Sequence, residues 1–339
     1  MRRNQYSSSS VAPPPPAQAP IDLSVVLVTG GYDHEIRFWE AWSGICSRTI
    51  PRTGESGQVN RIAISPDKRF VAAAIHKKIA VYDIASPSNT PINVCEGHTQ
   101  NVTSISYHSD GKWFVTGSED GTIRIWDMRQ VQSNQSHRTY DNQSPVNDVL
   151  IHPNQGELIS ADQNGNIKQW VLSTNECDLE LAPEADVPMR SITMAHDGTF
   201  LIAANHEGNC FVWRMTDDPN PQTRFKAVHR FKAHDNYLTR CVLSPDSHLL
   251  ATCSADTTIK IWNVHDNHTV SLRKTLTGHQ RWVWDAAFSA DSAYLVSASS
   301  DHVARLWDLE KAETLRQYNG HHKAVVCIAL NDRTLDYAD

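Results

Sequence analysis

The sequence predicts an all-β fold, a seven-bladed β-propeller closed by the C-terminal strand joining the N-terminal blade. The main observation behind this prediction is an aromatic residue that recurs every 43 to 49 residues and each time ends a short apolar alternation. A period of about 40 to 45 residues ending in Trp is typical of four-stranded units stacked as the blades of a ring. The seven recurring residues are Trp39, Tyr82, Trp126, Trp170, Trp213, Trp262 and Trp307.

Each repeat contains the strand pattern that a blade requires. In the third repeat, runs at residues 102–107, 113–117, 122–126 and 137–140 predict four strands. The pair Asp120-Gly121, between the second and third runs, is a strong signal for a tight hairpin turn. The same order returns at 234–262 and at 279–307, which supports one blade pattern along the chain.

The two ends of the chain complement each other. The first repeat begins at residues 25–29 in a second-strand pattern, and residues 324–330 form a first-strand pattern with no Trp after it. We therefore expect the last strand to become the innermost member of the first blade, which would remove the exposed edges of an open ring. The predicted domains are a disordered Ser- and Pro-rich tail at 1–20 with polyproline character, the propeller at 21–332, and a C-terminal tail at 333–339.

Composition and charge narrow the possible functions. The net charge of −7 argues against a nucleic-acid binder, and no run approaches the ~20 apolar residues that span a bilayer. Seven cysteines without a C-x-x-C pair indicate a reducing compartment, with Cys253 and Cys327 as small core residues. Neither a cofactor motif nor a metal-ligand spacing is present, so we expect no cofactor and no metal.

Three repeats carry a His, a Ser, an Asp and a Trp at matched offsets. A Ser-His-Asp set could indicate a hydrolase, but this one occurs three times, always with a Trp and without a G-x-S-x-G turn. We therefore expect no catalytic residue. The pattern resembles the WD-repeat family, in which indole, hydroxyl, imidazole and carboxylate form one buried structural network. The predicted members are His98, Ser118, Asp120, Trp126; His234, Ser254, Asp256, Trp262; and His279, Ser299, Asp301, Trp307.

Three other repeats depart from this pattern. They carry His76, Asn164 and Glu207 at the position where the Asp is expected. We expect these blades to depend more on ordinary packing than on the network.

Aligned first strands give one triplet per blade, with an apolar residue always in the middle. Its neighbours are mostly polar, so we expect these neighbours to lie on the rim of one propeller face. Trp282 and Trp284 break that rule, and we expect at least one of them to be exposed. In the order of the blades, Tyr237 lies on one side of these tryptophans. Ala324 and Val326 lie on the other side, followed by the amides of Gln58 and Asn60. Exposed patches rich in Trp and Tyr are typical of partner-binding sites. The triplets are 58–60, 101–103, 145–147, 188–190, 237–239, 282–284 and 324–326.

Several segments resemble a narrower family, the Lst-eight or G-protein-β-subunit-like family, which is the small propeller subunit of target-of-rapamycin (TOR) kinase complexes. The resemblance covers residues 22–332 and is most distinctive at the two-Trp segment. The segments are VLVTGGYD (26–33), RFW (37–39), SGIC (43–46), ELI (157–159), SPD (244–246), LLATCSAD (249–256), RWVW (281–284) and HKAVVC (322–327).

The resemblance implies a non-catalytic subunit of TOR complexes 1 and 2. Such a subunit binds and stabilises the TOR kinase domain, contacts other subunits through it, and supports growth, nutrient and actin signalling. The matching partner-binding residues here are Gln58, Asn60, Trp282 and Trp284. The implied location is the cytoplasm. The resemblance also allows a peripheral association with vacuolar or other endomembranes through the TOR complex.

One motif favours a different class of protein. Trp126-Asp127-Met128-Arg129 matches the W-D-x-R signature of WD-repeat substrate receptors of cullin-type ubiquitin ligases, although only Arg129 is distinctive in it. A scaffold with no assigned partner is a third reading, because fold does not fix function.

Overall fold

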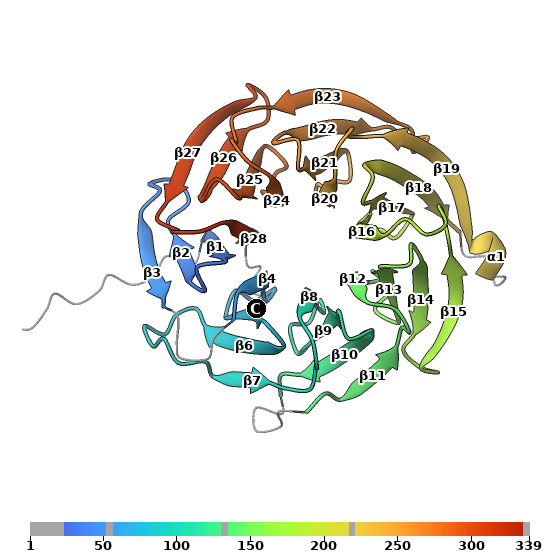
Figure 1. Cartoon of the computed structure of the whole chain (residues 1–339), viewed down its shortest axis with the longest axis horizontal. Coiled ribbons are helices and arrows are strands. Elements are labelled where there is room, and N and C mark those ends of the chain that lie inside the picture. The colour runs from blue at the N-terminus through green and yellow to red at the C-terminus, as the bar shows by residue number, and fades with distance from the viewer. Residues whose placement is uncertain (1–23, 52–56, 130–134, 217–220, 335–339) are drawn as a thin grey trace, which may run out of the picture.

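A computed structural model describes residues 24–51, 57–129, 135–216 and 221–334. These residues form seven four-stranded antiparallel sheets arranged as blades around a central channel (Figure 1), so the predicted fold is confirmed. The predicted tail at 1–20 lies outside the described residues, as do residues 335–339 of the predicted C-terminal tail.

The second strand of each blade is buried almost throughout, whereas the innermost strand contains both buried and partly exposed residues. The innermost strands are β28 (Val325–Asn331), β4 (Val59–Ile64), β8 (Val102–Tyr107), β12 (Val146–Ile151), β16 (Met189–Met194), β20 (Leu238–Leu243) and β24 (Val283–Phe288). The second strands are β1 (Val26–Gly31), β5 (Phe70–Ile75), β9 (Trp113–Ser118), β13 (Glu157–Asp162), β17 (Phe200–Asn205), β21 (Leu249–Ser254) and β25 (Tyr294–Ser299).

The outer two strands complete each blade. The third strands are β2 (Ile36–Trp39), β6 (Lys78–Asp83), β10 (Thr122–Asp127), β14 (Ile167–Val171), β18 (Asn209–Met215), β22 (Ile259–Val264) and β26 (Val303–Asp308). The outermost strands are β3 (Cys46–Ile50), β7 (Asn93–Cys95), β11 (Arg138–Asp141), β15 (Glu176–Leu181), β19 (Phe225–Lys232), β23 (Val270–Leu276) and β27 (Glu313–Asn319). One helical turn, α1 (Pro221–Arg224), precedes β19.

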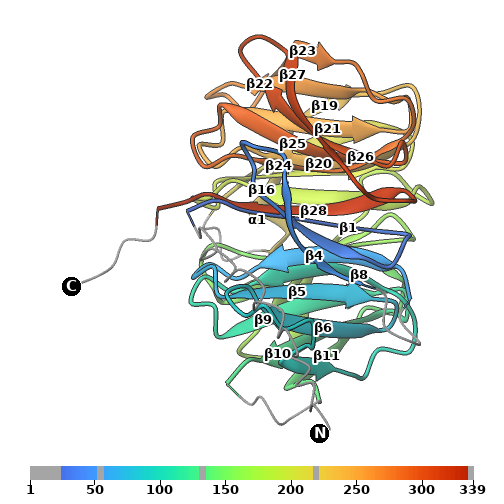
Figure 2. The same ribbon diagram turned by 90° about the vertical axis from the view of Figure 1, so that its left-hand side faces the viewer.

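The ring closes in the way that the sequence patterns at the two ends of the chain predict. β28 pairs with β1 in antiparallel register, with Leu27 opposite Leu330 and Thr29 opposite Ile328. The two strands lie side by side in Figure 2, although they come from opposite ends of the chain.

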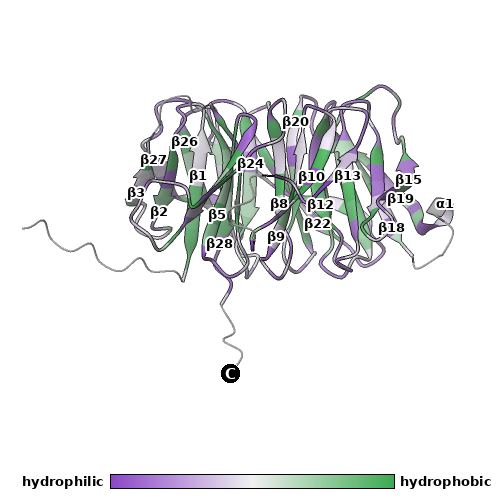
Figure 3. Cartoon of the chain, turned by 90° about the horizontal axis from the view of Figure 1, so that it is seen from below, coloured by the Kyte–Doolittle hydropathy of each residue, from purple (hydrophilic) through white to green (hydrophobic). Residues whose placement is uncertain are grey.

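The apolar core lies between neighbouring blades. Trp126 of the third blade, for example, belongs to one apolar cluster with Val81 and Ile79 of the second, and Trp307 to one with Ile261 of the sixth. Seen edge-on in Figure 3, the strands carry most of the apolar residues and the connecting loops at both faces most of the polar ones. Cys253 and Cys327 are fully buried, as predicted.

Every innermost strand contains a β-bulge at the same place. In the second blade Val59 lies opposite Ile75 and Arg61 opposite Ala74, so Asn60 has no pairing partner. The same shift follows the middle triplet residue in the six other blades. A bulge redirects the extra side chain, and here it turns the third triplet residue toward one face of the ring.

Candidate partner-binding face

The hydrogen-bonded networks predicted in the third, sixth and seventh blades are present, with one correction to their membership. The Trp126 indole N–H donates to Thr116 Oγ1 over 2.9 Å, and the His98 ring bonds to the same hydroxyl (2.8 Å) and to Asp120 (2.9 Å). Ser118 instead accepts from the Asp120 backbone N–H. The prediction of Ser118 as the network hydroxyl is therefore wrong. Ser118 lies two residues beyond Thr116 along β9, too far from the Trp126 indole to accept its hydrogen bond.

The sixth and seventh blades repeat both the network and the correction. Thr252 and Ser297 supply the hydroxyls, at 2.9 Å and 2.8 Å from the indole nitrogens of the blade Trp, in place of the predicted Ser254 and Ser299. Burial alone would raise the pKa of Asp301, but hydrogen bonds led by that from His279 bring it down to about 2. The remaining members join as in the third blade: His234 with Asp256 and Trp262, and His279 with Asp301 and Trp307.

A fourth network, missed from the sequence, joins the two chain ends. His321 bonds to Thr29 Oγ1 (2.8 Å) and to Asp33 (2.7 Å), and the Trp39 indole donates to Thr29 (2.7 Å). The spacing Thr-x3-Asp-x5-Trp could have revealed it, since Thr116, Asp120 and Trp126 share that spacing. Glu35 lies close to this cluster but pairs with Arg37.

The fourth blade uses amides in a variant of the network. The Trp170 indole donates to Ser160 (2.9 Å), whose hydroxyl donates to Asn142 (3.2 Å). Asn142 in turn donates to Asp162 over 3.3 Å, so it takes the place of the histidine. Asn164, which the sequence singled out at the Asp position, contributes only a backbone N–H to Asp162.

The triplets define one face of the ring, which we name the triplet face. In each blade the residue that follows the second strand donates its backbone N–H to the first triplet residue, as Ser300 does to Trp282 over 2.9 Å. Turn and triplet therefore lie side by side in all seven blades. These turn residues are Tyr32, His76, Glu119, Gln163, His206, Ala255 and Ser300.

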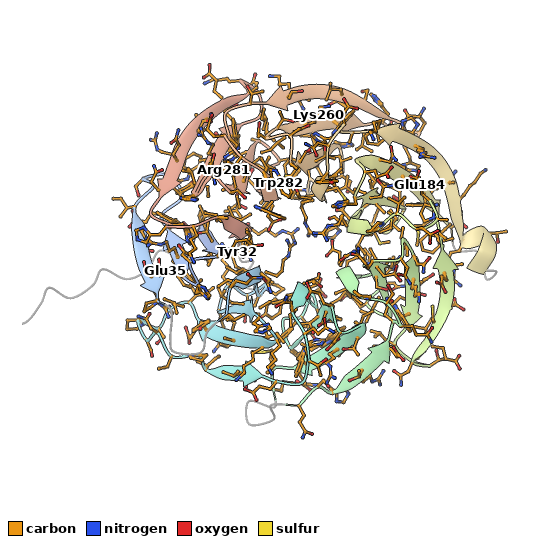
Figure 4. The ribbon with its side chains drawn as sticks, in the orientation of Figure 1. Tyr32, Glu35, Glu184, Lys260, Arg281 and Trp282 are labelled. Atoms are coloured by element: carbon orange, nitrogen blue, oxygen red, sulfur yellow. The ribbon has the colours of Figure 1, made fainter. Side chains whose placement is uncertain are left out.

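Four aromatic rings form a continuous row on this face, which we name the aromatic row. The His206 ring stacks on Tyr237 at 4.2 Å, Tyr237 meets Trp282 edge-on at 6.0 Å, and Trp282 lies 5.5 Å from Trp284. Tyr237 is 45% exposed and Trp282 41%, whereas Trp284 is half-buried and donates its indole N–H to Ser300. In Figure 4 Trp282 and Tyr32 lie close to the central channel.

The predicted amides lie on the same face but away from the tryptophans. Gln58 and Asn60 flank Val59 at the start of β4, and β28 lies between β4 and the Trp-bearing β24. The Asn60 side-chain nitrogen is buried and has no hydrogen-bond partner within the part of the chain that the structure describes. In the next blade Asn101 bonds to both His76 (2.8 Å) and Glu119 (2.9 Å). The triplet face thus has an aromatic half and an amide half.

Beneath the triplet face lies a layer of charge that crosses the channel. Asp285 pairs with Arg61 at 3.0 Å and with Arg240 at 3.5 Å, and Arg240 also pairs with Asp148. Sequence reasoning missed this layer, yet each member lies two residues after a middle triplet residue. The full layer, one residue per blade, is Arg61, Ser104, Asp148, Ser191, Arg240, Asp285 and Cys327.

Asp148 is surrounded by hydrogen-bond donors. Its carboxylate accepts from Ser104 (2.8 Å), from Ser191 (3.2 Å) and from the Ile192 backbone N–H (3.1 Å). Burial opposes the charge, but Arg240 and Arg61 together with these donors hold the pKa of Asp148 below its usual range. The two cations and two anions of the layer balance, so the layer itself carries no net charge.

Arg129, the distinctive residue of the ligase-docking motif, is on the surface. Its side chain is 67% exposed, and its guanidinium makes two hydrogen bonds to Asp127 of the same turn, at 2.9 and 2.7 Å.

Fold and networks together define a WD-repeat propeller. A model of the WD domain, G-beta repeat, matches residues 89–127, 131–171, 225–263 and 270–308. The chain is 58% identical to target of rapamycin complex subunit wat1 of Schizosaccharomyces pombe, over 93% of this chain and 98% of that protein. It is 53% identical to target of rapamycin complex subunit LST8 of Saccharomyces cerevisiae, over 91% and 100%, and 48% identical to LST8-1 of Arabidopsis thaliana, over 91% and 99%.

The chain therefore belongs to the LST8 family of target of rapamycin complex subunits. The names of these relatives describe subunits of a complex, and none describes an enzyme. Within the described part of the chain, no helix has the length and apolar character needed to cross a membrane.

Proposed function

We propose that this protein is a non-catalytic subunit of TOR complexes 1 and 2, and that it binds and stabilises the TOR kinase domain through the triplet face. The observation that carries the proposal is the exposed aromatic row, which no contact within the described chain covers. The relatives' names, which place them in TOR complexes, support the choice of partner.

The exposed area of the aromatic row indicates whether these rings alone could hold a stable complex. Covering the exposed part of Trp282 removes roughly 100 Å² from water, which is worth about 2.5 kcal/mol before the costs of association. Tyr237 offers a similar area, since 45% of it is exposed. Two rings alone do not offset those costs, so we place Gln58 and Asn60 in the same interface. Both side chains are partly exposed.

Binding supports the kinase if the subunit prefers the active arrangement of the kinase domain over the inactive one. The subunit then needs no chemistry of its own. TOR outputs in growth, nutrient response and actin organisation would follow from that preference. We place the protein in the cytoplasm, and on vacuolar or other endomembranes only through the complex, which subcellular fractionation with and without TOR would test.

The test is a double substitution, Trp282→Ala with Trp284→Ala, followed by purification from cells and identification of bound proteins. We expect loss of the TOR kinase, with an unchanged circular dichroism spectrum. The matched control is Leu272→Ala, which removes an apolar side chain that is 51% exposed on the outer strand β23. A folded double variant that still retains the kinase would contradict the proposed site.

A second pair separates the two halves of the face. Gln58→Ala with Asn60→Ala leaves the aromatic row intact, so we expect weakened rather than abolished kinase binding. Equal binding by this pair and the wild type would remove the amide half from the interface.

The ligase alternative has its own test. Arg129→Ala should abolish binding of a cullin adaptor if the protein is a substrate receptor, and should leave kinase binding unchanged if it is a TOR subunit. Wild-type protein that brings down a cullin adaptor and no kinase would overturn the proposal. The two hydrogen bonds from Arg129 to Asp127 give this residue a local role in its own turn, so we prefer the TOR assignment.

A further inference from the structure

A groove opens on the opposite face of the ring, beside the first blade. It has a volume of about 850 Å³. The strand register shows which face it is on, because β2 begins at the triplet face (Ile36 opposite Gly30) and ends with Trp39 at the other. Trp42, in the turn that follows β2, forms part of its wall together with Pro87 and Phe38.

Trp42 is the most exposed tryptophan of the described chain at 56%. Its ring is held edge-on against Tyr294 of the neighbouring blade at 5.3 Å, and its carbonyl accepts from Arg316 over 2.7 Å. The side chain is therefore positioned by the fold, and it lines the groove. The structure gives its indole N–H no acceptor among the residues described.

The first described residue lies in the same groove. Ser24 and Val25 line it, and the buried Lys68 donates to the Ser24 carbonyl over 2.5 Å, which fixes the point where the chain enters. Twenty-three residues precede Ser24, and they include the run Pro13 to Pro16.

We propose that the groove is the docking site of the chain's own N-terminal segment, with residues 13–16 packed against Trp42. A run of prolines favours the polyproline II conformation, in which the carbonyls point outward with no internal partner. Grooves that bind such segments present an aromatic face and a nearby N–H donor, and Trp42 offers both. The proline rings cover the indole, and a proline carbonyl accepts from its N–H.

The lengths agree with this docking. Four residues of polyproline II span about 12 Å, at about 3.1 Å per residue. The seven residues between Pro16 and Ser24 reach up to about 25 Å when extended. Because the segment is tethered at the groove, its effective concentration is on the order of 1 mM, so a contact is mostly occupied when its dissociation constant lies well below about 1 mM. A proline-rich partner or a second copy lacks this advantage.

The experiment follows Trp42 in the full chain. Tryptophans are labelled with 5-fluorotryptophan, the Trp42 signal is assigned with Trp42→Phe, and its broadening by a soluble gadolinium chelate is measured by fluorine NMR. We expect deletion of residues 2–20, or replacement of Pro13 to Pro16 by Ser, to increase the broadening of Trp42 severalfold. Trp282, exposed on the triplet face, serves as the internal control and should not change.

Each outcome decides the proposal. A synthetic peptide of residues 1–22 should restore protection of Trp42 in the deletion variant. Equal broadening in the full and deleted chains would overturn the proposal, and would leave the groove open to a proline-rich partner. Protection that rises with protein concentration would also overturn it, because a second copy would then be the occupant.

Discussion

Thr29 and His321 are 292 positions apart in the chain, and a hydrogen bond of 2.8 Å joins Thr29 Oγ1 to His321 Nε2. The bond belongs to the same kind of network that holds a single blade together elsewhere in the ring. Here it spans the two ends, so the contact that closes the ring is polar and directional as well as apolar. The register of β1 and β28 is thereby fixed by a side chain as well as by the backbone ladder.

Removal of the closing strand should destabilise the whole ring. Deletion of residues 324–339 removes Val325, Cys327 and Ile328 from the core and leaves β1 as a bare edge. The loss of several buried apolar side chains predicts a fall in melting temperature of about 10 °C or more. Deletion of 335–339 alone is the control and should have little effect. Unchanged melting of the longer deletion would refute this account of closure.

The corrected network gives a sharp comparison between two neighbouring hydroxyls. Thr116→Val keeps the shape but leaves the Trp126 indole N–H and the His98 ring without their shared partner, which should lower the free energy of unfolding by about 2–3 kcal/mol. Ser118→Ala removes only a turn contact and should cost about 0.5–1 kcal/mol. Chemical denaturation measures both. Equal losses would restore Ser118 as an equal member of the network.

The network error shows what the sequence could and could not determine. The period of the tryptophans, the strand order and the closure all follow from patterns within the chain, and they were predicted. Thr116 and Ser118 share one side of β9, so alternation cannot choose between them. Only the register of β9 against β10, which places Phe114 opposite Trp126, brings Thr116 to the indole.

The charged layer should be sensitive to the loss of one anion. Asp285→Asn leaves Arg61 and Arg240 partly unpaired below the triplet face, which predicts a loss of about 2–4 kcal/mol in the free energy of unfolding. Asp110→Asn is the matched control, because Asp110 pairs with His108 and Lys112 near the surface and should cost at most about 1 kcal/mol. Similar losses for both variants would argue against a structural role for the layer.

Sequence reasoning missed the charged layer for a different reason. Arg61, Asp148, Arg240 and Asp285 lie on four blades, with no short spacing that connects them. Alignment of the triplets brings them into one register, but the bulge after the middle residue breaks simple alternation. The period therefore cannot show which side chains reach the channel.

Acid should weaken the seventh blade through Asp301. Its folded-state pKa of about 2 lies below the unfolded value of about 3.9, so its contribution to stability is complete above pH ~4 and is lost as the pH falls toward 2. The free energy of unfolding, measured between pH 5 and 2 with Asp301→Asn alongside, should fall less steeply for the variant. Parallel curves would show that Asp301 makes no linked contribution.

Thiol reactivity should follow burial. Cys177 is exposed, whereas Cys95, Cys210, Cys241, Cys253 and Cys327 are buried. Burial raises the pKa of the Cys95 and Cys241 thiols to about 12, so they carry almost no thiolate at neutral pH. Brief treatment with iodoacetamide, read by peptide mass spectrometry, should modify Cys177 first. Early modification of Cys95 would indicate that its blade opens readily.

The triplet face repeats one geometry seven times, and this has a consequence for how the protein can be changed. Every blade presents two triplet side chains and one turn side chain in equivalent positions. The residues that a partner protein contacts can therefore be changed one position at a time. Some third triplet residues also bond to the next blade, as Thr103 does to the Val146 carbonyl and Thr239 to the Val283 carbonyl. Moving the Trp pair from one blade to another would rotate the binding site around the ring axis, with the loss of such a bond where the receiving blade makes one.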